Sequence, residues 1–272
     1  MQIPQQLLQA VASRQIVPFV GSGVSMDVSS QHFCSWDELL QEMVGAITNN
    51  NARGGVLYRL ETGRLLEAAE DAMQILGASE FRRIMLRRFG YRETVGDLTL
   101  PKAIWDLQPQ RVITTNYDRV LQWANPKSHA VLSGQSGNMQ EFLNPEDNPK
   151  VWHLHGHVDD SDTLVLTKSQ YTELYSSGES GSESSKRARF TLQSIWASAS
   201  LLFIGFGLRD RYVMESLLGM LELFGGHARE RFVLMCEQDQ GQFTAWDKYR
   251  ITPVLYTAHG VILYLSQAVN CP

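Results

Sequence analysis

Two short stretches, Ile113-Thr-Thr-Asn-Tyr-Asp118 and Val151-Trp-His-Leu-His-Gly-His157, decide the fold of this 272-residue chain. Each begins with apolar residues typical of a buried strand and then changes to polar, reactive side chains. In a sheet of parallel strands, ligands bind in the crevice at the carboxyl ends of the strands. We therefore expect Asn116, Asp118 and His155 to face one crevice. Asn and Asp at a strand-to-helix junction are also favoured helix caps, and this simpler role stays open.

A third stretch, Ile16-Val-Pro-Phe-Val20 followed by Gly21-Ser-Gly-Val-Ser25, predicts a strand that runs into a tight glycine turn. Strand, glycine turn and helix together form a phosphate-binding device, because glycines let backbone N–H groups approach a pyrophosphate. The dinucleotide fingerprint also requires a third glycine three positions after the second, and Met26 occupies that position. Taken alone, the stretch is equally compatible with an ordinary tight turn.

The bulk composition indicates a globular protein, because 43% of the residues are hydrophobic and can form a substantial core. The net charge of -5 argues against a dedicated binder of nucleic acid or of anionic membranes. The three cysteines, Cys34, Cys236 and Cys271, form no C-x-x-C pair and cannot build a four-cysteine zinc ribbon. The first residues lack a basic region and a long apolar run, so we expect a cytoplasmic protein without a membrane span.

Short apolar runs alternate with helical patterns along most of the chain. Strands are expected at residues 16–20, 111–115, 129–132, 151–155, 163–166, 200–205, 230–236 and 261–265. Helices are expected at residues 4–13, 36–47, 63–76, 79–89, 117–123, 169–175, 187–199, 211–224 and 242–250, with Ser35 and Asp210 as caps. Segments 49–55 and 133–150 have the composition of turns and connections. The alternation predicts an α/β, Rossmann-like, mainly parallel sheet with helices on both faces.

Residues from about 37 to 107 show no convincing strand and interrupt this alternation. We interpret them as a helical insertion within a single domain that spans residues 1–272. One of its helices, 79–89, pairs an apolar stripe with four arginines that form either a solvated face or a site for an anion or a partner. The low-complexity segment Ser176–Ser185 is expected to be mobile and could cover the crevice.

Three alternating histidines, His153, His155 and His157, would share one face if their strand continued, and this arrangement would suggest a metal site. Gly156 is expected to break the strand. Apart from two aspartates that follow, no nearby cysteine or acidic residue completes a familiar ligand spacing. We therefore expect no metal.

The order of four motifs is far more specific than any one of them. Gly-Ser-Gly-Val-Ser at 21–25, Thr-Thr-Asn-Tyr-Asp at 114–118, Leu-His-Gly at 154–156 and Gly-Phe-Gly-Leu at 205–208 occur in the order found in sirtuins. From about residue 15 to 265 the chain resembles a sirtuin-related domain, and more particularly the divergent bacterial branch of antiphage NAD-hydrolase effectors. The resemblance implies an NAD-binding, Rossmann-like fold with a small helical module.

The resemblance also implies roles for individual residues. The residues expected to bind NAD are Gly21, Ser22, Gly23, Ser25, Asp118, Gly205 and Gly207. The first four would lie along the pyrophosphate and the adjoining ribose, the aspartate at the nicotinamide ribose, and the last two glycines at the adenosine half. His155 matches the catalytic histidine of the family's His-Gly motif, and Asn116 is the second expected catalytic residue.

The chain departs from the deacylase members of the family. Their Gly-Ala-Gly is Gly-Ser-Gly here, their Thr-Gln-Asn-Ile-Asp is Thr-Thr-Asn-Tyr-Asp, and the cysteines of their zinc ribbon are missing. Without an acyl-lysine nucleophile, water is the natural acceptor. His155 can then act as general base, Asn116 can orient water or the ribose, and Asp118 can favour the developing positive charge. We expect an NAD hydrolase that releases nicotinamide and ADP-ribose.

Other functions stay open from the sequence: an NAD-dependent protein deacylase, an ADP-ribosyltransferase, or a non-catalytic nucleotide-sensing module. The bacterial branch implies an NAD-depleting effector in antiphage defence. Such an effector would be a homo-oligomer, or would assemble with an ATPase or an Argonaute-type protein. Direct binding of nucleic acid or of a membrane is not expected.

Overall fold

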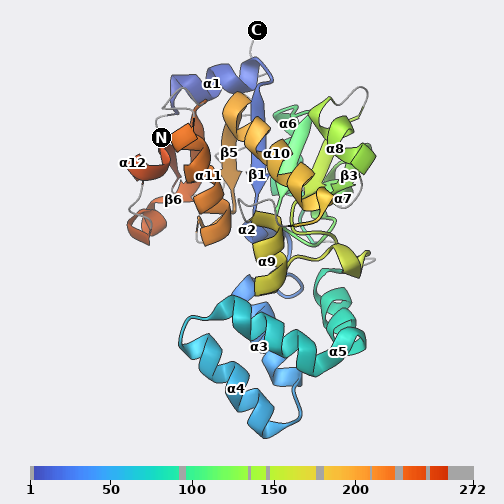
Figure 1. Ribbon diagram of the computed structural model, residues 1–272. Coiled ribbons are helices and arrows are strands. Elements are labelled where there is room, and N and C mark those ends of the chain that lie inside the picture. The colour runs from blue at the N-terminus through green and yellow to red at the C-terminus, as the bar shows by residue number, and fades with distance from the viewer. Residues whose placement is uncertain are drawn as a thin grey trace.

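The computed structural model describes residues 3–91, 96–133, 136–144, 148–175, 181–208, 210–223, 229–242 and 246–256. Within these ranges, seven parallel strands form one sheet in the order β3-β4-β2-β1-β5-β6-β7 (Figure 1). The strands are β1 (Ile16–Val20), β2 (Arg111–Thr114), β3 (His129–Leu132), β4 (Lys150–His153), β5 (Ser200–Ile204), β6 (Arg231–Cys236) and β7 (Ile251–Tyr256).

Helices cover both faces of the sheet, which confirms the expected Rossmann-like α/β fold. The helices around the sheet are α1 (Gln5–Ala12), α2 (Ser22–Val28), α6 (Thr99–Asp106), α7 (Val120–Ala124), α8 (Ser136–Leu143), α9 (Lys168–Tyr175), α10 (Glu183–Ser198), α11 (Arg211–Leu223) and α12 (Trp246–Tyr249). No helix among the described residues is long and apolar enough to cross a membrane.

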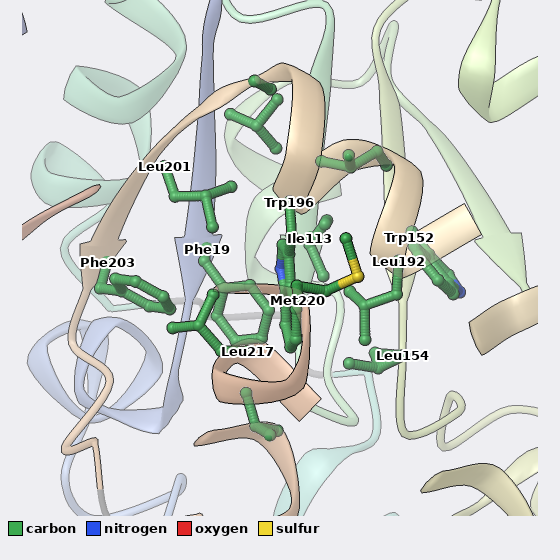
Figure 2. Packing of buried hydrophobic residues seen from close by; sticks show 14 of the residues in the cluster. Phe19, Ile113, Trp152, Leu154, Leu192, Trp196, Leu201, Phe203, Leu217 and Met220 are labelled. Carbon is green, nitrogen blue, oxygen red and sulfur yellow. The ribbon is translucent and has the colours of Figure 1, made fainter. Parts of the chain in front are cut away.

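The central strand β1 shows why the strands are apolar at every position. Its five residues are all buried, and alternate side chains enter two different cores. Phe19 packs with Trp196 of α10 and Leu217 of α11 on one face, as Figure 2 shows. Ile16 and Val20 enter the opposite core, which α1 and α6 complete. Because both faces of β1 are buried, its sequence lacks the alternation of apolar and polar residues that is typical of a strand with one exposed face.

The register of the sheet aligns the carboxyl ends of three strands. Phe19 of β1 is paired with Ile113 of β2 on one side and with Phe203 of β5 on the other. The chain passes from β1 to β2 in one direction and later crosses to β5 in the other. The strand order therefore reverses at β1, and such a switch point opens a ligand crevice at the carboxyl ends.

Three of the helices between β1 and β2 form a compact module below the sheet in Figure 1: α3 (Trp36–Ala46), α4 (Asn50–Glu61) and α5 (Leu65–Phe89). Ser35 and Glu38 form the expected capping box at the start of α3. The two expected helices 63–76 and 79–89 meet in α5 at Gly77, which has a φ of 74°. We call α3, α4 and α5 the helical module.

The arginines of α5 are largely used within the chain. Arg87 and Arg88 both pair with Glu42 of α3, and Arg83 pairs with Glu80 one turn earlier. The apolar stripe of the same helix is buried in the module's core. The two pairs with Glu42 therefore tie α5 to α3, which favours the structural interpretation of the arginines over a partner site.

Several local expectations were wrong. Segment 49–55 is not a turn, because the Asn49 side chain accepts from the amides of Asn51 and Ala52 and starts α4 there. Residues 163–166 do not form a strand, since Thr163 ends the 3-10 helix η1 (Ser161–Thr163) and Leu164 and Leu166 insert into the core of the helical module. The expected connection 133–150 contains α8, whose Phe142 packs against Trp152.

The remaining differences concern the ends of elements, the low-complexity segment and the last strand. Strand β4 stops at His153 instead of residue 155, and α7 begins at Val120 instead of residue 117. The carboxyl-terminal part of the low-complexity segment is ordered, because Ser182 caps α10, whereas residues 176–180 lie outside the described residues. Strand β7 was missed, and the strand expected at 261–265 lies outside the described residues.

Candidate active site

The end of β2 is fixed to the end of β1 by a chain of hydrogen bonds. The Thr114 hydroxyl donates to the Val20 carbonyl at 2.9 Å, and it accepts from the Asn116 amide at 3.0 Å. The Asn116 side chain then donates through Nδ2 to the Gly21 carbonyl and to the Ser25 hydroxyl, each at 3.0 Å. The structure thus brings Asn116 against the glycine turn, as the parallel arrangement of the strands predicted.

These contacts fix the orientation of the Asn116 amide. A carbonyl oxygen only accepts hydrogen bonds, so the nitrogen of the Asn116 side chain must face Gly21. The Oδ1 atom then points away, and it is buried without a hydrogen-bond partner among the described residues. A buried acceptor without a donor is unfavourable by about 1–3 kcal/mol. A ligand that offers a hydroxyl, an amide N–H or a water molecule would satisfy it.

Asp118 is the second buried polar group at this end of β2 and is only 4% exposed. Burial raises the pKa of its carboxyl group to about 6, while hydrogen bonds from the Val120 amide and the Ser25 hydroxyl act in the opposite direction. The bond to Val120, at 3.0 Å, shows that Asp118 also caps the first turn of α7. Ser25 therefore links Asn116 to Asp118.

The glycines of the turn allow two backbones to approach each other. A Cβ atom on Gly21 would lie 2.5 Å from the Gly205 carbonyl oxygen, and one on Gly23 would lie 2.9 Å from the same atom. Gly205 itself has a φ of 60°, and its Cβ would lie 2.6 Å from the Val24 nitrogen. The amides of Gly21 and Gly23 donate to Ile204 and Gly205. The turn therefore packs on the end of β5.

This packing changes the interpretation of the glycine motif. Two of its amides are used inside the protein, so the simpler structural role that the sequence left open is present. Ser22 and Gly23 on one side, and Gly205 and Gly207 on the other, remain exposed at the carboxyl edge of the sheet. Their expected contacts with NAD stay a prediction.

His155 lies two residues after the end of β4, and its side chain is only 2% exposed. Its Nε2 atom is 2.7 Å from the Tyr175 hydroxyl, and its Nδ1 atom is 3.4 Å from the Tyr171 hydroxyl. Burial lowers the pKa of His155 to about 4, and the charge of Asp210 opposes this shift. The imidazole is therefore neutral near pH 7, which is the form that a general base requires.

The three alternating histidines do not act as one cluster. Gly156 has a φ of 84°, and the rings of His153 and His157 meet edge to face at 4.7 Å between ring centroids, while His155 contacts the tyrosines. His153 donates from Nδ1 to the Asn116 carbonyl at 3.0 Å. Among the described residues, no group of three histidine, cysteine or acidic side chains is arranged to hold a metal ion.

Sequence reasoning missed the environment of His155. Tyr171 and Tyr175 come from α9, which packs against α5 of the helical module and against α10 and α11. Asp210 caps α11 as expected, but its second oxygen also accepts from the Tyr171 hydroxyl at 3.2 Å. The spacing of the two tyrosines places them on one side of a helix. No local pattern indicates that this side faces His155.

The comparisons agree with this architecture. The family model of the SIR2-like domain matches residues 110–254, more than half of the chain, and the chain belongs to this family. The resemblance to sirtuins expected from the four motifs is thereby confirmed. The NAD(+) hydrolase ThsA of Enterococcus faecium is 25% identical over 230 residues, which are 84% of this chain and 44% of that relative.

A crystal structure described as a complex of a Sir2 homolog with NAD shares the fold. Its TM-score is 0.52 at 16% sequence identity, and the match covers 98% of this chain and 94% of that chain. The similarity covers nearly the whole of both chains and shows that they share a fold.

Proposed function

We propose that this chain hydrolyses NAD at the bond between nicotinamide and ribose, and releases nicotinamide and ADP-ribose. The observation that supports this most is the Asn116 Oδ1 atom, a buried acceptor without a partner among the described residues. Asn116 is linked through Ser25 to the buried carboxyl group of Asp118, and both residues follow β2, next to the switch point of the sheet. The name of the relative ThsA, an NAD(+) hydrolase, supports the same reaction.

The charge balance of the reaction explains the residue types. The nicotinamide ring carries the positive charge of NAD and leaves as a neutral molecule when its bond to the ribose breaks. The charge then moves to the ribose, where the ionised carboxylate of Asp118 would stabilise it in a site of low dielectric. Asn116 would orient the attacking water or a ribose hydroxyl by accepting its hydrogen bond through Oδ1.

The attacking water must lose one proton as its oxygen bonds to the ribose. His155 would accept this proton, directly or through a ribose hydroxyl, because its imidazole is neutral and follows β4, the strand paired with the one that Asn116 follows. In this structure the Tyr175 hydroxyl is hydrogen-bonded to His155 Nε2, so the substrate would have to replace that hydrogen bond.

We further propose that NAD hydrolysis by this chain serves bacterial antiphage defence in the cytoplasm, as the likeness to the divergent bacterial sirtuins implies. The chain spans 44% of the length of the relative it matches. Assembly as a homo-oligomer, or with an ATPase or Argonaute-type partner, belongs to the same proposal. Depletion of cellular NAD on infection of cells that express the chain, and no depletion with a His155→Ala variant, is the expected result.

The direct test is incubation of the purified chain with NAD and separation of the products. Equal amounts of nicotinamide and ADP-ribose, without any added acceptor, are expected. Cleavage that needs an acylated peptide would indicate a deacylase instead, and ADP-ribose found only on an added protein would indicate a transferase. Saturable NAD binding with no cleavage over hours would contradict the proposal and favour a sensing module.

A further inference from the structure

A second set of polar contacts meets the imidazole of His155 at Nδ1, the ring nitrogen that Tyr175 does not contact. The Tyr171 hydroxyl is 3.4 Å from His155 Nδ1 and 3.2 Å from Asp210 Oδ2, so it lies between the two. Tyr171 is only 5% exposed. These three side chains come from separate parts of the fold: His155 from the end of β4, Tyr171 from the helix α9 and Asp210 from the start of α11.

The direction of each hydrogen bond follows from the number of protons available. A tyrosine hydroxyl has one proton, and an ionised carboxylate only accepts. The Tyr171 proton is therefore donated to Asp210, which leaves the lone pairs of that hydroxyl facing His155 Nδ1. The ring nitrogen opposite a lone pair must carry the proton. The lone pair of the neutral imidazole then lies on Nε2, where it accepts from the Tyr175 hydroxyl at 2.7 Å.

We propose that Tyr171 and Asp210 are positioning residues that hold His155 in the tautomer with its proton on Nδ1 and its basic lone pair on Nε2. The inference rests on the proposed function for its effect on turnover, but the tautomer itself is independent of it. In this arrangement the Tyr175 hydroxyl occupies the place of the water or ribose hydroxyl from which Nε2 would take a proton. Asp210 would also stabilise the imidazolium that forms, as an acid does in a catalytic triad.

Few of the described groups lie close enough to His155 to influence where its imidazole carries the proton. Tyr171 and Tyr175 contact its ring at centroid distances of 4.9 and 5.9 Å, and Tyr212 of α11 packs against both tyrosines. Asp210 is the charged side chain whose electrostatic effect on His155 is resolved, and it favours the protonated ring. Two hydroxyl-bearing rings therefore contact the imidazole directly, and Tyr171 connects it to the carboxylate of Asp210.

Asp210→Asn is the informative variant, because the two oxygens of Asp210 have different partners. Oδ1 accepts from the amides of Tyr212 and Val213 and caps α11, while Oδ2 accepts from Tyr171. An asparagine must keep its oxygen toward the two amides, and asparagine is an equally good cap. Its NH₂ group then faces Tyr171 and donates to it. The Tyr171 proton is forced toward His155 Nδ1, which would move the imidazole proton to Nε2.

The test combines nitrogen NMR of the histidine rings with steady-state kinetics. In the wild type, the His155 signals, assigned with His155→Ala, should show a protonated Nδ1 and an unprotonated Nε2. Asp210→Asn should move the proton to Nε2 and lower kcat at least about tenfold with little change in KM, because a base in the wrong tautomer cannot act. Tyr171→Phe should lower kcat as well. Tyr212→Phe removes a neighbouring hydroxyl and should change neither the His155 tautomer nor kcat.

Each possible result decides the proposal. A wild-type imidazole with its proton on Nε2, or an Asp210→Asn variant with unchanged tautomer and unchanged kcat, would overturn it. A shifted tautomer with unchanged kcat would also overturn the role in turnover. If Asp210→Asn fails to fold, Tyr171→Phe gives the same two readings. If the wild type cleaves no NAD, the proposed function fails, and the NMR result alone decides whether Tyr171 and Asp210 hold the His155 tautomer.

Discussion

Thr114 at the end of β2 is the register partner of His153 at the end of β4. Asn116 and His155, the two residues expected to be catalytic, each follow their strand's paired residue by two positions. Both side chains are buried, one against the glycine turn and the other against the tyrosines of α9. Two neighbouring strands of one sheet therefore deliver an amide acceptor and a basic imidazole to the same edge.

The first prediction concerns the acceptor on Asn116. Asn116→Ala should lower nicotinamide release by about 10²-fold or more, the size of effect found when one oriented hydrogen-bonding group is removed from an active site. It should also lower the free energy of unfolding by about 1–2 kcal/mol, because the Gly21 carbonyl and Ser25 lose a donor. Kinetics with NAD and urea unfolding measure the two effects.

A matched control is Asn125→Ala, which removes an asparagine outside the site that holds the Lys127 amide after α7. This variant should keep wild-type turnover. Turnover within threefold of wild type in a folded Asn116→Ala protein would remove Asn116 from the mechanism.

The second prediction concerns the pH dependence of turnover. The pKa of Asp118 is raised to about 6 and that of His155 is lowered to about 4, so above pH 6 the carboxylate is ionised and the imidazole is neutral. As the pH falls, Asp118 takes up its proton first. The acid limb of kcat/KM should therefore lie near pH 6 and report Asp118, whereas His155 would add a second fall only near pH 4.

Asp118→Asn tests this assignment. The variant should be slow at every pH because the carboxylate is lost, and its remaining turnover should show no limb near pH 6. A limb that stays near pH 6 in Asp118→Asn would assign it to another group.

The third prediction concerns stability at acid pH. Burial lowers the pKa of His153 to about 3 and of His155 and His157 to about 4, from the ordinary value of 6.5. Below pH 6.5 the unfolded chain binds these protons and the folded chain does not. The three histidines therefore destabilise the fold progressively from pH 6.5 down to about 4, by about 1.4 kcal/mol per pH unit for each proton.

Asp118 acts in the opposite direction. Its pKa is raised from 3.8 to about 6, so between those values the folded chain binds the proton first and gains stability as the pH falls. Asp118→Asn lacks this compensation and should lose stability more steeply than wild type between pH 6 and pH 4. Thermal unfolding at intervals of half a pH unit measures both slopes, and parallel slopes would contradict the prediction.

The fourth prediction concerns the Tyr175 hydroxyl. It is hydrogen-bonded to His155 Nε2 at 2.7 Å, and a substrate that binds to this nitrogen must first displace the hydroxyl. Tyr175→Phe keeps the ring and removes the competing hydrogen bond, which is worth about 1 kcal/mol. KM for NAD should therefore fall about fivefold, without a fall in kcat. A higher KM would show instead that the hydroxyl contributes to NAD binding.

Much of the fold follows from signals that span only a few residues. The apolar run Ile16–Val20 predicts a strand buried on both faces, and the pairs Ser35 with Glu38 and Asp210 with the start of α11 predict helix starts. These elements were predicted correctly because side-chain and backbone groups close in sequence form them. The same reasoning failed at 49–55, since asparagines and glycines are typical of turns but one of them caps α4.

The candidate site also has features that follow from the sequence and features that only the tertiary structure shows. The sequence by itself indicated that Asn116 and Asp118 come just after one strand, that His155 lies at the end of another, and that glycines occupy the turn after the first. Only the tertiary structure decided that these glycines pack on Gly205, and that the Tyr171 hydroxyl lies between His155, 16 positions before it, and Asp210, 39 positions after it. The physical reason is that a hydrogen bond between distant residues depends on how whole helices and strands pack, and no short stretch of sequence specifies that packing.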